Sequence, residues 1–149
     1  MIRSDKRLRL CVGLIALNLL FIWGNSLLPG EVSGEISDAV KDLLAAMLPG
    51  DGLEASGGGL IRKLAHLTEF ACLGALLAWL RGRLQWKRGT ALLLGIAAAC
   101  TDETIQRFVP GRGPSVWDVL IDSSGVLMGI LLLLLGHSCL NRKKLEDKS

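Results

Sequence analysis

Three residues spaced four and three positions apart could carry out proton transfer in this chain. Arg62, His66 and Glu69 follow an i, i+4, i+7 pattern, which places their side chains on one face of a helix. A histidine titrates near neutral pH, and a neighbouring carboxylate can orient it or exchange a proton with it. We therefore predict that His66 and Glu69 form an acid–base pair.

Two later segments add carboxylates that could take part in the same chemistry. Asp102 and Gln106 are four positions apart in one segment, and Asp118 and Asp122 have the same spacing in the next. Each pair therefore shares one face of a helix. The candidate catalytic residues are His66, Glu69, Glu103 and Asp118.

Cations close to these carboxylates could bind an anion. Arg62 and Lys63 begin one apolar segment, and Arg112 lies in a rigid Pro-Gly-Arg-Gly-Pro loop at residues 110–114. From there its guanidinium can bind a phosphate or a carboxylate. The alternative for Arg112 is an anchor among lipid headgroups. The candidate ligand-binding residues are Arg62, Lys63, Asp102, Gln106, Arg112 and Asp122.

Metal binding is a weaker hypothesis for the same residues. His66 could bind an ion together with Asp102, Glu103 or Asp118, but one histidine among arginines is a poor ligand set for zinc. The four cysteines are widely spaced in apolar stretches and form no CxxC pair, so a thiolate site is not expected either. We therefore predict no metal and no cofactor.

Long apolar segments must position these residues. A helix needs about 20 mostly apolar residues to cross a bilayer. Half of this chain is hydrophobic, and four segments reach that length if their ionisable residues are tolerated. The predicted transmembrane helices cover residues 8–28, 61–80, 90–108 and 117–137.

A further helix is predicted between the first two spans. Val32, Ile36, Val40, Leu43 and Met47 recur at helical spacing, with acidic residues between them. Such an amphipathic helix either lies on the membrane surface or packs over the mouth of the bundle. We predict an all-α fold, an integral membrane four-helix bundle with one extracytoplasmic amphipathic helix, as a single domain over residues 1–149.

Basic residues are concentrated in three segments that four spans would place on one side of the membrane. These segments precede the first span, join the second to the third, and follow the fourth. Each holds four basic residues, which makes 12 of the 17 in the chain. Because cytoplasmic loops carry the excess of Lys and Arg, we predict a multi-pass protein of the cell membrane with both termini in the cytoplasm.

This topology places the ionisable residues of three spans at one depth, in the halves nearest the exterior. A charge facing lipid costs about 2.5–3.5 kcal/mol on insertion scales. The helix faces that carry these ionisable residues should therefore point toward each other and form a polar pocket open to the outside. Gly125 and Gly129 lie on the same helix face as Asp118 and Asp122 and should let a neighbouring helix approach closely. The alternative is a self-satisfied charge network that only holds the bundle together.

Three motifs of the chain resemble the VanZ-like family. Residues 62–70 read RKLAHLTEF, residues 102–112 read DETIQRFVPGR, and residues 118–125 read DVLIDSSG. Many members have asparagine where Asp122 stands, and a histidine where Ile105 precedes the glutamine. The resemblance implies a multi-pass bacterial membrane protein of the cell envelope, in a family named after a member linked to teicoplanin resistance.

From the pocket and the resemblance together, we predict a protein that binds or modifies an anionic lipid or a cell-wall precursor. A transporter or proton-coupled carrier is the first alternative, although the inner halves of the spans carry no matching charges. A structural or sensing membrane module is the second. Nucleic acid is not an expected partner, because no basic stripe with interleaved aromatic residues occurs.

Overall fold

The protein is described by a computed structural model that covers residues 6–47, 58–113 and 115–146, with side chains as far as residue 139. Within these ranges the chain is helical and contains no strand, which confirms the prediction of an all-α fold. The helices are α1 (Lys6–Ser26), α2 (Gly30–Met47), α4 (Gly58–Leu84), α5 (Thr90–Gln106) and α6 (Val116–Glu146).

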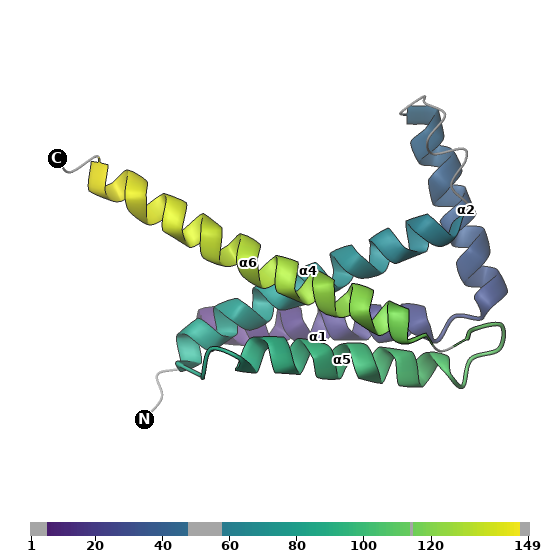
Figure 1. Cartoon of the computed structure of the whole chain (residues 1–149), viewed down its shortest axis with the longest axis horizontal. Helices are drawn as coiled ribbons and strands as arrows, with labels where there is room; N and C mark the ends of the chain where they lie inside the picture. The colour runs from purple at the N-terminus through teal and green to yellow at the C-terminus, as the bar shows by residue number, and fades with distance from the viewer. Residues whose placement is uncertain (1–5, 48–57, 114, 147–149) are drawn as a thin grey trace.

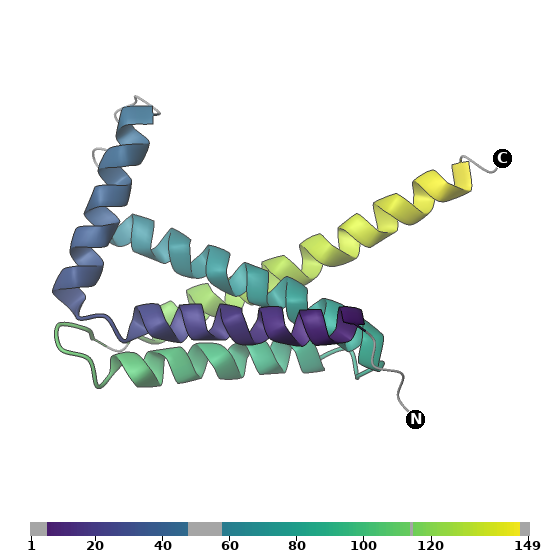
Figure 2. The same cartoon turned by 180° about the vertical axis from the view of Figure 1, so that it is seen from behind.

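Three of these helices are long and apolar enough to cross a membrane. They are α1, α4 and α6, with apolar stretches of 21, 26 and 24 residues. The fourth predicted span corresponds to α5, which has 17 residues and carries two carboxylates near its end. Since α5 packs against α1, α4 and α6, it completes the group of four helices (Figures 1 and 2). That α5 crosses the membrane remains a prediction.

Most predicted helix ends differ from the observed ones by a few residues, and the end of α6 differs by nine. α1 ends at Ser26 rather than at residue 28, and α5 ends at Gln106 rather than at residue 108. After α5, backbone hydrogen bonds of the tighter i to i+3 type join Ile105 to Phe108 and Gln106 to Val109, just before Pro110 prevents further helix. α6 extends beyond residue 137, into the basic C-terminal segment.

The helix ends fall into two groups (Figure 1). The start of α1, the α4–α5 turn and the end of α6 lie toward one end of the molecule, so the three basic segments share that end. The α1–α2 connection and the α5–α6 loop lie toward the other end, beside α2. This arrangement agrees with the grouping of loops on which the predicted orientation depends.

Glycines bring α4 and α6 into close contact where they cross. A methyl group added at Gly129 would overlap the backbone of Ala71, and one added at Gly125 would meet the carbonyl oxygen of Leu67. On α4, Gly74 faces the backbone of Val126 in the same way. The predicted close approach at the Gly125–Gly129 step therefore occurs, with α4 as its partner.

The apolar core is small, and most large apolar side chains lie on the outside. Ile22, Phe70, Leu73 and Val126 are among the buried members of the core. By contrast, Leu20 on α1 is 70% exposed, and residues of α6 such as Leu135 are similarly open. An outward apolar surface of this kind suits helices surrounded by lipid.

The amphipathic helix is confirmed as α2, and its closest contact with the bundle is made by small polar residues rather than by its apolar stripe. α2 packs against α4 and buries Ser33 and Ser37, whose small side chains permit a close approach. Its apolar residues remain largely open, from Val32 at 40% exposed to Met47 at 70%. The stripe is thus partly open, with Ile36 and Val40 lining a cavity beside α1 and α4 and the remaining apolar residues available to the membrane surface.

Two proline–glycine turns hold α2 against the α5–α6 loop. The N–H of Gly30 donates to the carbonyl of Pro110 at 3.0 Å. Gly111 has a φ of +72°, a left-handed conformation that glycine adopts without strain. Because Pro29 ends the connection from α1 and accepts the first hydrogen bond of α2 at Ser33, this contact fixes where α2 begins.

Candidate functional site

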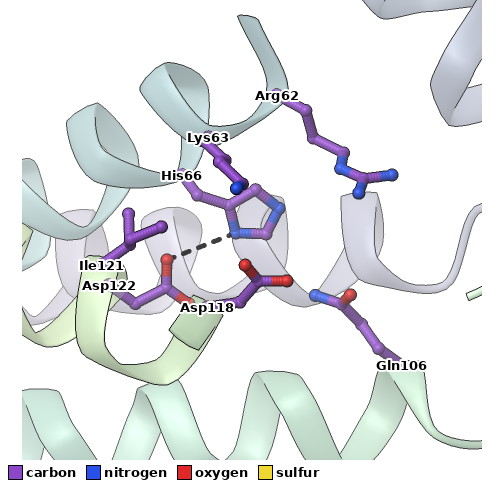
Figure 3. A pocket seen from close by; sticks show the side chains of 7 residues that line it. All are labelled: Arg62, Lys63, His66, Gln106, Asp118, Ile121 and Asp122. Atoms are coloured by element: carbon purple, nitrogen blue, oxygen red, sulfur yellow. Dashed lines mark ion pairs between the residues drawn. The ribbon is translucent and has the colours of Figure 1, made fainter. Parts of the chain in front are cut away.

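Residues from three helices meet at a single point near the α2 end of the bundle. His66 of α4 lies close to Asp102 of α5 and to Asp122 of α6, and Figure 3 shows its ion pair with Asp122. Its Nδ1 is 3.8 Å from Asp102 Oδ2 and 3.6 Å from Asp122 Oδ1. The two aspartates are 0% and 1% exposed, and the histidine side chain is 14% exposed. These three residues are called the His–Asp–Asp centre below.

Asp102 is held in place by hydrogen bonds from its neighbours. The hydroxyl of Ser26 donates to Oδ1 at 2.6 Å, and the amide of Gln106 donates to Oδ2 at 2.8 Å. The same Gln106 nitrogen lies 3.3 Å from the Ser26 hydroxyl. A buried carboxylate needs such donors, and here they fix its direction toward His66.

Asp122 has a different environment from Asp102. It is 1% exposed, and neither of its carboxylate oxygens has a hydrogen-bond partner in the described part of the chain. One turn of α6 separates it from Asp118, which is half-buried and faces the same opening. A buried carboxylate without donors is uncommon and calls for a partner such as a cation.

Arg112 connects the α5–α6 loop to the end of α1. Its Nε donates to the carbonyl of Leu28 at 3.2 Å and its Nη2 to that of Asn25 at 3.0 Å, while Nη1 lies 3.4 Å from Gln106 Oε1. Burial, followed by the cation of Arg62, lowers the pKa of the Arg112 guanidinium. An arginine starts from a pKa of about 12 or more, so the group remains charged at neutral pH.

Glu69 and Glu103 are hydrogen-bonded to different parts of the chain. Glu69 Oε1 accepts a hydrogen bond from Asn25 at 3.1 Å, and its second oxygen is buried without a partner among the described residues. Glu103 Oε1 accepts the backbone N–H of Ser115 at the start of α6, and its Oε2 is also unpartnered. Glu69 therefore faces α1, whereas Glu103 ties the end of α5 to the next helix.

Two cavities adjoin the His–Asp–Asp centre. The smaller one has a volume of about 10 Å³, enough for about one water molecule or one ion. Its lining residues are Arg62, Lys63, His66, Gln106, Asp118, Ile121 and Asp122 (Figure 3).

The larger cavity, of about 150 Å³, lies between α1, α2 and α4. Arg62 and His66 line both cavities, while Arg112 and Glu69 line only the larger one. This cavity is lined by both charged and apolar side chains, whereas the smaller cavity is lined by polar side chains apart from Ile121. The residues on its apolar side are Leu28, Ile36, Val40, Ile61 and Ala65.

The structure brings together most of the predicted site residues. Eight of the ten predicted site residues line one cavity or both, and Asp102 accepts a hydrogen bond from one of them, Gln106. Glu103 lines neither cavity and faces Ser115 instead. The residues that line a cavity are Arg62, Lys63, His66, Glu69, Gln106, Arg112, Asp118 and Asp122.

The candidate site residues chosen from the sequence left out the contribution of α1. Asn25 and Ser26 bind the carboxylates of Glu69 and Asp102, although neither was a candidate site residue. The signal that could have identified them is their place at the outer end of the first apolar segment, level with the ionisable residues of the other helices. Uncharged polar residues carry little weight in hydropathy reasoning, so this signal is easily overlooked.

Comparisons with known proteins agree with these observations over most of the chain. A family model described as VanZ/LLP1 matches residues 10–137. No curated protein and no solved structure matches the chain. The matched region contains the His–Asp–Asp centre, both cavities and all described helices apart from the two terminal extensions.

Proposed function

The chain belongs to the VanZ/LLP1 family, and from this we propose that it is a multi-pass membrane protein that binds or modifies an anionic amphiphile. The amphiphile is a lipid phosphate or a lipid-linked cell-wall precursor, bound in the cavity between α1, α2 and α4. The observation that carries the proposal is the composition of that cavity, which joins two arginines to an apolar wall.

The cavity suits a molecule with a charged head and an apolar chain. Arg62 and Arg112 supply cations, and a guanidinium can bind phosphate through two parallel hydrogen bonds. Three N–H groups of Arg112 already donate to the protein, so Arg62 is the principal anion ligand. Ile36 and Val40 of α2 form the wall along which an acyl or prenyl chain would leave toward the membrane.

Proton transfer completes the proposal if the bound molecule is modified. His66 lines both cavities, and Glu69 lines the larger one with a free carboxylate oxygen. A histidine beside a carboxylate can accept a proton from a nucleophile and return it to a leaving group. Asp118 lines the smaller cavity together with Lys63 and would assist proton transfer there. Glu103 would affect the site indirectly, because its hydrogen bond with Ser115 holds the start of α6.

The proposed location follows from the distribution of charge. The three basic segments lie toward one end of the molecule (Figure 1), and the positive-inside rule assigns that end to the cytoplasm. The cavity end then faces the exterior, where lipid-linked cell-wall precursors are exposed to glycopeptides. A link to glycopeptide resistance would follow if modification of such a precursor changed glycopeptide binding.

Titration of the purified protein in neutral detergent with a polyprenyl phosphate and with dioctanoyl phosphatidic acid tests the proposal. Each ligand is compared with its phosphate-free alcohol, which should bind more weakly. Hydrogen bonds to charged groups contribute about 1.5–3 kcal/mol, so Arg62→Ala should weaken binding of the phosphate by about 10-fold or more.

Arg107→Ala is the matched control for this titration. Arg107 is an exposed arginine at the end of α5 that lines neither cavity, so its removal should leave binding unchanged. Equal binding of phosphate and alcohol, or equal losses in the two variants, would contradict an anion site at Arg62. A preference for the polyprenyl ligand over phosphatidic acid would favour the cell-wall precursor.

A further inference from the structure

Three potential metal ligands from three helices converge at the His–Asp–Asp centre. One donor atom each from His66, Asp102 and Asp122 lie within 4.8 Å of one another. In the sequence these residues are 36 and 20 positions apart, and the partner that completes the trio is Asp122 rather than Glu103 or Asp118. The arrangement therefore alters the expectation of no metal.

The distances within the centre are those of ligands around an ion rather than of direct hydrogen bonds. An N–H to carboxylate hydrogen bond spans about 2.7–3.2 Å, whereas the two distances from His66 Nδ1 are 3.6 and 3.8 Å. In a tetrahedral site with bonds of about 2.1 Å, neighbouring ligand atoms are about 3.4 Å apart. Both distances from His66 Nδ1 are therefore close to the spacing of neighbouring ligand atoms around one ion.

The burial and the hydrogen bonds of Asp122 and Asp102 support a metal site independently of the distances. Asp122 is 1% exposed, receives no hydrogen bond on either oxygen from the residues that the structure describes, and points toward His66 (Figure 3). Asp102 receives hydrogen bonds from Ser26 and Gln106, the kind of second-sphere contact that orients a metal-binding carboxylate. A cavity of about 10 Å³ beside His66 and Asp122 leaves room for one further small ligand such as water.

We propose that His66, Asp102 and Asp122 bind one divalent first-row metal ion, with manganese as the best-matched ion and zinc as the comparison. One imidazole and two carboxylates combine the ligands that these metals prefer. With a neutral histidine, the two buried carboxylates carry two negative charges that a divalent cation neutralises. The competing arrangement is a metal-free centre in which a protonated His66 bridges the two aspartates.

This metal site goes beyond the proposed function and does not depend on anion binding at Arg62. With His66 Nδ1 on the ion, its Nε2 carries the proton, so proton transfer in the larger cavity would fall to Glu69. The anion is assigned to Arg62 and the larger cavity, whereas the metal ion is assigned to His66 and two aspartates that do not line that cavity. Metal binding is measured without any lipid. A failure of the lipid titration therefore leaves the metal proposal standing, and the reverse also holds.

The first experiment is titration of chelator-stripped, detergent-solubilised full-length protein with zinc and with manganese. We expect about one ion per chain and a higher thermal midpoint with the ion bound. Asp122→Asn should weaken binding by about 100-fold or more, because loss of a second-sphere partner alone costs about 10–100-fold. Asp38→Asn, the same change at an exposed position on α2, should bind as the unaltered protein does.

Spin-echo spectroscopy of the manganese-loaded protein identifies the nitrogen ligand without relying on Asp122→Asn to fold. The chain has two histidines, and His137 is exposed on α6. The signal of one coordinated nitrogen should disappear in His66→Gln and persist in His137→Gln. No binding by the unaltered protein, undiminished binding in His66→Gln, or a nitrogen signal that depends on His137 would each overturn the proposal.

Discussion

Gly129→Val is expected to prevent α4 and α6 from packing and to cause the largest loss of stability among the variants considered. The added side chain would overlap the backbone of Ala71, which cannot move without displacing the whole of α4. Overpacking a core costs about 1–3 kcal/mol even where neighbouring side chains can adjust. A clash with backbone should exceed that range and lower the thermal midpoint in detergent strongly.

Gly136→Val provides the matched control on the same helix. A methyl group at Gly136 meets no atom within 4 Å, so this variant changes helix propensity and lipid contact but no helix crossing. Thermal midpoints and size-exclusion profiles of the two variants measured side by side separate these effects. Equal stability of Gly129→Val and Gly136→Val would show that the crossing of α4 and α6 is wrong.

Arg112→Ala is expected to have the second-largest effect, a loss of about 2–5 kcal/mol. Two of its N–H groups donate to carbonyls at the end of α1, and a third approaches Gln106. A cation at a helix C-terminus also interacts favourably with the helix dipole, and each hydrogen bond to a charged group contributes about 1.5–3 kcal/mol. Thermal unfolding in detergent measures the loss.

Arg112→Lys separates charge from geometry at this position. A lysine keeps the positive charge but cannot reproduce the planar fork that reaches Leu28 and Asn25 together, so we expect an intermediate stability. Arg107→Ala removes an exposed arginine nearby and should leave the midpoint unchanged. If Arg112→Ala were as stable as Arg107→Ala and lost only phosphate binding, Arg112 would act as an anion ligand rather than as a link between α1 and the loop.

The helices and their shared polar level could be predicted because each depends on local pattern. Apolar length identifies α1, α4 and α6, and helical spacing identifies α2. The four-residue spacing of Gly125 and Gly129 was enough to predict a close contact with a neighbouring helix. The ends of α5 and α6 were less predictable, because they depend on turns after Gln106 and on helical continuation into a polar segment.

The pairing of side chains in the site could not be predicted, because it depends on how the helices rotate against one another. Asp118 and Asp122 share a stripe in the sequence, yet Asp122 alone is close enough to His66 and Asp102 to complete the centre. Arg112 offers another example. Its sequence position suggested an anion ligand, and only the fold reveals the carbonyls of α1 beside it.

The membrane side of the His–Asp–Asp centre and its cavities is the claim on which the proposed function depends. It can be measured by cysteine accessibility in a chain whose four native cysteines have been replaced. Lys63→Cys and Arg88→Cys place single thiols at exposed positions near opposite ends of α4 and its following turn. A membrane-impermeant maleimide applied to intact cells should label Lys63→Cys, and should label Arg88→Cys only after permeabilisation. The reverse pattern of labelling would place the site in the cytoplasm and contradict the account.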